Sequence, residues 1–144
     1  MKTLPLLLLL ASPLATADDI ATPAQLKASP DIVIADEMGE CAGLIKAAAE
    51  RKKDAQPENA AVLANLENGV IGYTAVSLFY IRSHFSKNHI DDDPDEWVRS
   101  KVNRSRISAL MFLEDASIQK ELRRCDTVDF PLASATVEKL RHTK

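Results

Sequence analysis

Two cysteines are the residues of this 144-residue chain best suited to covalent chemistry. Cys41 and Cys125 lie far apart in the sequence, and neither belongs to a C-x-x-C arrangement, the spacing typical of reactive thiol pairs. In an oxidising compartment two cysteines usually form a disulfide bond. We therefore expect Cys41 and Cys125 to be structural and to be bonded to each other.

Histidines and acidic side chains are the next candidates, as metal ligands. Five of the six residues over 91–96 are acidic, but this run has no glycine at its sixth position and no glutamate at its twelfth, as a calcium-binding loop requires. His84 and His89 are five positions apart, which is an awkward spacing for two ligands on one helical face. The sequence therefore predicts no metal site and no cofactor.

Side chains that could act in catalysis are present, but they form no known catalytic pattern. Asp36, Glu37 and Glu40 lie close together, and acid or base catalysis by one of them would require burial that raises its pKa. The serines near His84 lack a G-x-S-x-G turn, and no Glu-x-x-His pair suited to a di-metal site occurs. No catalytic residue is assigned, and a small extracytoplasmic enzyme is the third hypothesis for function.

Glycines within helical patterns need an explanation, because each destabilises a helix interior by about 0.5–1 kcal/mol relative to alanine. Gly69, Gly72 and Tyr73 open the most apolar stretch of the chain. Either two helices approach closely there, or a ligand fits beside the tyrosine. The second interpretation makes these three residues a candidate ligand pocket and supports an alternative function, a periplasmic carrier of a small molecule or metal.

Charged residues of opposite sign follow one another at the start of the third predicted helix. Such a layout is typical of a solvated helix face, but two patches of opposite sign also orient a partner protein and speed its encounter. The candidate partner surface consists of Asp91, Asp92, Asp95, Arg99, Arg104 and Arg106.

The N-terminal segment has the pattern of a secretory signal peptide. Lys2 precedes an apolar run over 4–10, and Ala15 and Ala17 provide the small residues that a signal peptidase reads. We expect residues 1–17 to be removed and the mature protein to be periplasmic or secreted. The apolar run is too short to cross the roughly 30 Å hydrocarbon core of a membrane, so no membrane span is expected in the mature chain.

Two prolines and the absence of a sustained period over 18–30 predict a flexible N-terminal arm. The arm precedes a single helical domain over 31–144, a length that suits one domain.

Apolar residues recur at helical spacing through most of that domain. They predict three long helices over 31–53, 57–87 and 93–124, a loop over 126–130, and a short C-terminal helix that starts at Pro131. No stretch alternates apolar and polar residues as a strand does. The predicted fold is therefore all-α, an up-down bundle of three long helices plus a short C-terminal helix, stapled by one disulfide.

The stretch 69–81 in the second predicted helix is apolar almost all round, which predicts burial on several sides. If three helices cannot cover residues such as Val70, Ile71 and Phe79, a second copy or a partner must complete the core. The sequence therefore leaves a homodimer possible as the way to cover this face.

The net charge of −3 gives no reason to expect nucleic acid or an anionic membrane as a partner, because both need a dominant basic face. The first hypothesis is a small exported, non-enzymatic helical module that binds another extracytoplasmic protein, for example as an inhibitor or immunity protein. The sequence identifies no partner.

Overall fold

The computed structural model describes residues 30–131; the predicted signal peptide, residues 18–29 of the arm and the helix predicted beyond Pro131 lie outside the described residues. The chain divides into two units after Pro30, and the helices belong to the second unit, Asp31–Lys144. Between residues 30 and 131 the structure is helical, without a strand. Its elements are α2 (Pro30–Ala55), α3 (Ala60–Asn88), α4 (Pro94–Phe112), α5 (Asp115–Arg124) and a π-helical turn, η2 (Cys125–Asp129).

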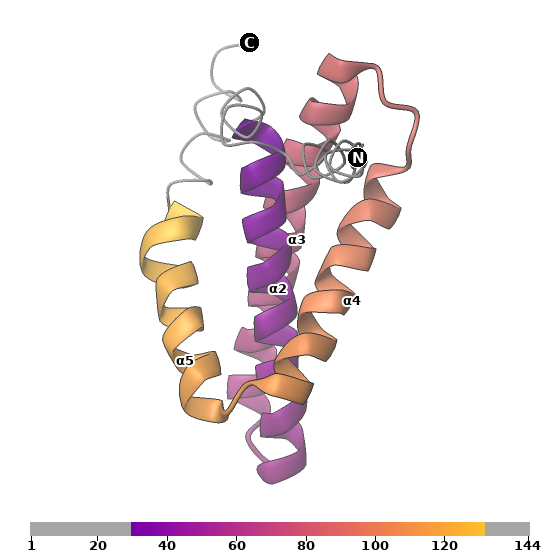
Figure 1. The fold of residues 1–144 in the computed structure, drawn as a ribbon. Coiled ribbons are helices and arrows are strands. Elements are labelled where there is room, and N and C mark those ends of the chain that lie inside the picture. The colour runs from indigo at the N-terminus through magenta and orange to yellow at the C-terminus, as the bar shows by residue number, and fades with distance from the viewer. Residues whose placement is uncertain (1–29, 132–144) are drawn as a thin grey trace, which may run out of the picture. The chain divides into compact units, whose positions relative to one another are not determined.

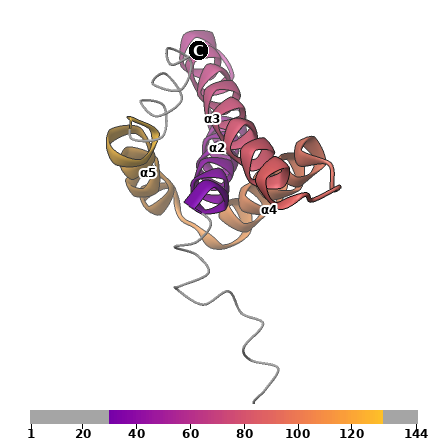
Figure 2. The ribbon, with the colours of Figure 1, turned by 90° about the horizontal axis from the view of Figure 1, so that it is seen from above.

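Consecutive helices run in opposite directions: α2 and α4 run one way, and α3 and α5 run the other way (Figure 1). Seen from above, α4 and α5 lie on opposite sides of the α2–α3 pair (Figure 2). Short connections favour such antiparallel neighbours. The predicted class is confirmed: an all-α, up-down bundle with three long helices and a short helix after them.

Local sequence signals placed most helix ends correctly. The bounds of α2 and α3 lie within three residues of the predicted ranges 31–53 and 57–87. The carboxylate of Asp93 caps α4 by accepting a hydrogen bond from the N–H of Asp95 at 2.9 Å, with Pro94 in the first turn. An acidic N-cap followed by proline is a strong helix start, and the predicted start of the third helix at residue 93 is confirmed within one residue.

The predicted extent of the third helix, 93–124, is wrong. Its helix α4 ends at Phe112, the backbone of Leu113 and Glu114 is extended, and α5 begins at Asp115. Neither glycine nor proline occurs at this turn, so no local helix-ending signal indicates it. Met111 and Phe112, at the end of α4, lie at the surface, where 67% and 75% of their area is exposed.

A side chain from a distant helix holds the α4–α5 turn. Arg51 of α2 donates hydrogen bonds from its Nη2 to the carbonyls of Ala109, Leu110 and Leu113, at 3.3, 3.2 and 2.7 Å. Its Nη1 lies 2.7 Å from a carboxylate oxygen of Asp115, in the first turn of α5. The guanidinium thus supplies charged donors to carbonyls at the end of α4, where the helix leaves most carbonyls without an intrahelical partner.

The loop predicted over 126–130 is also wrong, because the chain continues through η2. The N–H of Phe130 bonds to the carbonyl of Cys125, five residues earlier. Tyr73 of α3 holds this turn: its ring centroid lies 4.5 Å from that of Phe130, and its hydroxyl donates to Asp126 at 2.7 Å. These contacts are tertiary, and helical periodicity does not reveal them.

Glycines allow α2 and α4 to pack very closely. A Cβ atom on Gly43 would lie 2.5 Å from the Cβ of Ser105 and 2.6 Å from the carbonyl oxygen of Val102. One on Gly39 would lie 2.8 Å from the Cγ of Lys101. No side chain fits there, so these two glycines serve the close approach of two helices.

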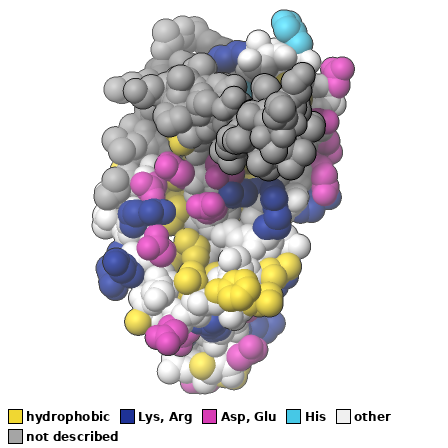
Figure 3. Space-filling view, in the orientation of Figure 1, with side chains coloured by type: hydrophobic (Ala, Val, Ile, Leu, Met, Phe, Trp, Pro, Cys, Tyr) yellow, Lys and Arg dark blue, Asp and Glu magenta, His cyan; other side chains and the backbone are white. Residues whose placement is uncertain are grey.

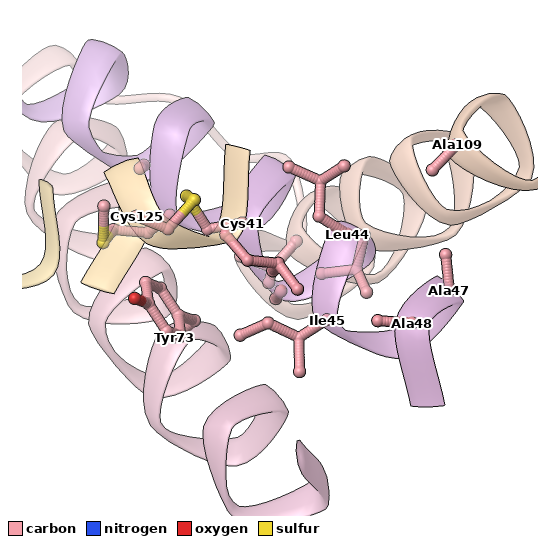
Figure 4. Close-up of a cluster of buried hydrophobic side chains, with 14 of the residues drawn as sticks. Cys41, Leu44, Ile45, Ala47, Ala48, Tyr73, Ala109 and Cys125 are labelled. Atoms are coloured by element: carbon pink, nitrogen blue, oxygen red, sulfur yellow. A yellow bond between two sulfur atoms is a disulfide. The ribbon is translucent and has the colours of Figure 1, made fainter. Parts of the chain in front are cut away.

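The core lies where the helices converge. Met38 of α2, Ile81 of α3, Val98 of α4 and Ile118 of α5 are almost fully buried. Figure 4 shows small side chains toward one end of this core, where Ala47 of α2 lies across from α4, and Tyr73 and the two cysteines toward the other end.

Candidate functional site

The predicted disulfide is present in the structure. The sulfur atoms of Cys41 and Cys125 are 2.00 Å apart, and both residues are buried. The bond joins the middle of α2 to the first residue of η2. Both thiols are used in this bond, which agrees with a structural role for the two cysteines.

An acidic side chain lies close to the disulfide. A carboxylate oxygen of Asp129 is within 4.8 Å of the two sulfur atoms, and the Oδ2 of this residue is buried and accepts no hydrogen bond from a described residue. The Nε of Arg124 is 3.3 Å from that oxygen, without hydrogen-bond geometry. Burial and the charge of Asp129 raise the pKa of Glu37, one turn before Cys41. Two sulfurs and a carboxylate could ligate a metal, but the intact disulfide keeps the sulfurs bonded to each other.

The candidate ligand pocket, Gly69, Gly72 and Tyr73, lies on the same side of the core. The Tyr73 side chain is buried, and burial together with its hydrogen bond to Asp126 raises the pKa of its hydroxyl well above the ordinary value. A Cβ on Gly72 would be 3.7 Å from Phe130, an ordinary contact, so this glycine is not required by close packing. Ligand binding at these residues stays a prediction.

Two of the three acidic residues of α2 that were considered for catalysis, Asp36 and Glu40, pair with a lysine. The Nζ of Lys101 lies 2.6 Å from Asp36 and 3.0 Å from Glu40. Burial of Lys101 opposes its charge, but hydrogen bonds to the two carboxylates outweigh burial and raise its pKa. These groups therefore form a charged contact between α2 and α4. His84 is buried beside Asn88, whose amide nitrogen lies 3.3 Å from its Nδ1.

The structure distributes the predicted partner surface over two sides of α4. At 100° per residue, Arg104 points about 140° away from Arg99 around the helix. Asp95 and Arg99 line a hollow between α3 and α4, whereas Arg104 lines a different hollow beside α2. Arg106 turns toward α2, where its Nη1 lies 2.9 Å from both carboxylate oxygens of Glu50.

The acidic half of that surface contains both paired and unpaired charges. Asp95 pairs with Arg82 at 3.0 Å, and Arg99 pairs with Glu96 at 2.8 Å. Asp91 and Asp92 are exposed and form no ion pair within residues 30–131.

A concave surface along α3, which we call the α3 groove, lies next to these residues. It consists of two hollows that share Lys46 and Val70. From Leu63 to Leu78 it follows α3 over about 22 Å, at 1.5 Å per residue. On α3 it is lined by Leu63, Glu67, Val70, Ile71, Thr74 and Leu78.

The α3 groove is lined by polar and charged side chains as well as apolar ones, and Ile71 is the exposed large apolar side chain among them. Ile71 is 67% exposed, although it lies in the middle of a long helix. The sequence indicated part of this result, because the stretch 69–81 is too apolar all round for its neighbours to cover. Leu63 and Glu67 were not predicted, since they precede that stretch and their role depends on the position of α2.

No helix within residues 30–131 combines the length and the apolar character needed to cross a membrane. Comparison of the chain with protein families, with curated proteins and with solved structures found no match.

Proposed function

We propose that this protein is an exported, non-enzymatic module that binds another extracytoplasmic protein through the α3 groove. Inhibitors and immunity proteins act in this way, by occupying a surface of their target. The proposal depends chiefly on one observation, the exposure of Ile71 in the α3 groove, in the middle of a long helix. Exposed apolar surface bordered by charges is characteristic of sites that bind proteins.

The shape of the groove favours a helix as the bound element. A groove of about 22 Å accommodates some four turns of an α-helix, and an amphipathic helix buries one apolar face in such a groove. Val70 and Leu78 would contact that face from α3, and Val102 from α4.

The charges along the groove favour a particular orientation of the bound helix. Lys46 and Lys53 line the part next to α2 and form no ion pair within the described residues. Asp91 and Asp92 lie just before α4, beyond the other end of the groove. A partner helix with acidic residues toward the lysines and basic residues toward Asp91 and Asp92 would be complementary in charge.

Site-specific photo-cross-linking tests this function in cells that export the protein. A photoreactive amino acid at position 71 should give one discrete cross-linked protein, which mass spectrometry identifies. The same amino acid at Val62, another exposed apolar residue of α3 outside the groove, should not give that product.

The interaction is then measured with both purified proteins. Ile71→Asp should raise the Kd by about tenfold or more, because a charge in the apolar centre of an interface is costly, whereas Val62→Asp should change it little. Equal effects of the two substitutions, or the same cross-linked products from both positions, would contradict the proposal.

Export is a separate part of the proposal and has its own measurement. Protein recovered from the periplasm or the medium should have the mass of a chain that begins at Asp18. Recovery of the full-length chain from the cytoplasm only would contradict export.

A further inference from the structure

The disulfide lies next to a third side chain of a type that ligates metals. Asp129 follows Cys125 by four residues in η2, and a carboxylate oxygen of Asp129 lies within 4.8 Å of both sulfur atoms. Both cysteines are buried, and Asp129 is partly buried. We call Cys41, Cys125 and Asp129 the Cys–Cys–Asp cluster.

The carboxylate of Asp129 is poorly compensated in this position. Its Oδ2 is buried, accepts no hydrogen bond from a described residue, and lies 3.3 Å from the Nε of Arg124. A buried charge is unfavourable unless it is hydrogen-bonded, paired or bound to a metal. The charge of Asp129 also opposes ionisation of Glu37, one turn before Cys41. A cation at the cluster would reduce both penalties.

The π-helical geometry of η2 places two of the three ligands together. The N–H of Phe130 bonds to the carbonyl of Cys125, five residues earlier, so four positions complete most of one turn. Cys125 and Asp129 therefore extend to the same side of η2. Cys41 comes from α2, and its Cα atom lies 6.0 Å from that of Cys125. Turns of this kind are rare and frequently occur at functional sites.

We propose that the reduced protein binds one zinc ion through the thiolates of Cys41 and Cys125 and the carboxylate of Asp129. Reduction of the disulfide by a phosphine or a dithiol adds two electrons and two protons and gives two thiols. Zinc then displaces the two thiol protons as two Zn–S bonds and one Zn–O bond form. Water takes the fourth position of a tetrahedral site.

The size of the cluster suits zinc. Zn–S and Zn–O bonds of about 2.3 Å and 2.0–2.2 Å place the ligand atoms of a tetrahedral site roughly 4 Å apart. The ligand atoms of the cluster already lie within 4.8 Å of one another. Two thiolates also favour a thiophilic ion over calcium or magnesium, which prefer oxygen ligands.

Other acidic side chains offer less to a divalent cation. Within residues 30–131, no other set of three His, Cys, Asp or Glu side chains brings its ligand atoms this close together. On the face seen in Figure 3, acidic side chains over the middle of the bundle lie beside Lys and Arg side chains. One such contact is that of Lys101 with Asp36 and Glu40. Carboxylates paired in this way compete weakly for a cation.

The disulfide and the zinc ion exclude each other, because both use the same two sulfur atoms. Either of them links α2 to η2, so zinc replaces the covalent link when the disulfide is reduced. Oxidised glutathione reverses the step: it takes two electrons from the two thiolates and becomes two thiolates itself, the disulfide forms again, and zinc is released. The cluster is thus a zinc site controlled by the redox state of the protein.

Zinc titration of the mature protein tests the proposal, after reduction by a phosphine and removal of the reductant. In competition with a chromophoric chelator, the reduced protein should bind one zinc ion per chain, and the oxidised protein should bind none. Cobalt(II) in place of zinc should give thiolate-to-metal charge-transfer absorption, which oxidised glutathione should abolish. Zinc should raise the Tm of the reduced protein. If reduction unfolds the chain, zinc should restore its helical circular dichroism.

Two substitutions in η2 distinguish the complete cluster from a pair of thiols. Asp129→Asn should raise the zinc Kd of the reduced protein by about tenfold or more, because it removes a charged ligand. Asp126→Asn is the matched control, since Asp126 lies in the same turn but outside the cluster. Asparagine still accepts the hydrogen bond from Tyr73, so this variant should keep the zinc Kd within about threefold. The mass of each oxidised variant verifies that the disulfide forms.

Three results would overturn the proposal. These are a reduced protein that binds no zinc, an oxidised protein that binds zinc equally well, and an Asp129→Asn variant that binds zinc as tightly as Asp126→Asn. The last result would mean that two thiols chelate the ion without the carboxylate. Binding of a partner protein at the α3 groove is measured separately with Ile71→Asp, so failure of one proposal leaves the other intact.

Discussion

Helix α5 is fastened to α2 at both of its ends, by two different kinds of interaction. At its C-terminal end, the disulfide between Cys41 and Cys125 joins it to the middle of α2. At its N-terminal end, Arg51 of α2 hydrogen-bonds to the α4–α5 turn and pairs with Asp115. One contact is covalent and buried, and the other is polar and partly exposed.

The two ends also differ in how well their charges are matched. Near the disulfide, the buried Oδ2 of Asp129 accepts no hydrogen bond from the described residues, and the pKa of Glu37 is raised. Around Arg51, three carbonyls of the α4–α5 turn accept hydrogen bonds from the guanidinium, and the carboxylate of Asp115 balances its charge. A covalent bond tolerates an unfavourable electrostatic environment, whereas a polar contact depends on complementary partners.

Removal of the disulfide should have the largest effect. Replacing both Cys41 and Cys125 with alanine should lower the free energy of unfolding by about 4 kcal/mol, because the bond restricts a long loop in the unfolded chain. The two residues are separated by 84 positions. Urea unfolding of the variant and of the oxidised protein measures the difference. A loss below about 1 kcal/mol would show that the bond is not the main fastening of α5.

Removal of the Arg51 side chain should have the second largest effect. Arg51→Met should lower the free energy of unfolding by about 2 kcal/mol, because it leaves helix-end carbonyls without a charged donor. Hydrogen exchange should become faster at the N–H of Leu113, which bonds to the carbonyl of Ala109. Lys53→Met is the control, since Lys53 is exposed and should contribute little. Equal losses in the two variants would mean that Arg51 acts only as a surface charge.

The sequence predicted the disulfide at the C-terminal end of α5 but did not predict the Arg51 contact at its N-terminal end, for a physical reason. Each of the two cysteines has one possible intramolecular partner, so their pairing follows from composition. Arg51 looked like a cation at the end of its own helix, where it would interact with the local dipole. Its actual hydrogen bonds connect residues about 60 positions apart, and local periodicity contains no information about such contacts.

The candidate site was predictable to a similar degree. The excess of apolar residues over 69–81 indicated a face that the chain alone would not cover, and Ile71 is exposed there. The charges after Asp93 were predicted as one surface, but they point to different sides of α4, because residues five apart differ by about 140° around a helix. The helix end at Phe112 was not predicted, because its stabilising contact comes from Arg51 of α2.

Loss of one hydrogen bond at the disulfide end should have a smaller effect. Tyr73→Phe removes the hydroxyl that donates to Asp126 at 2.7 Å and should lower the free energy of unfolding by about 1 kcal/mol. A double-mutant cycle with Asp126→Ala isolates the contact, because the two changes should not be additive if the residues interact. Additive changes would mean that this hydrogen bond does not stabilise η2.

The smallest effect should come from Glu37 and should depend on pH. Burial and the nearby charge of Asp129 raise the pKa of Glu37 above its ordinary value of 4.5, although Arg124 opposes them. Between 4.5 and the raised pKa the folded state holds more protons than the unfolded state, so stability falls as the pH rises through that interval. Glu37→Gln removes this effect and should raise the Tm slightly at pH 7.

At about pH 4, where the carboxyl is largely protonated in both states, the two proteins should have similar Tm values. Glu114→Gln is the control, because Glu114 is exposed and forms no ion pair within the described residues. It should leave the Tm unchanged at both pH values. A lower Tm of Glu37→Gln at pH 7 would mean that the Glu37 charge stabilises the fold. The charges around the disulfide would then be as well matched as those around Arg51. The two contacts between α5 and α2 would differ only in that one of them is covalent.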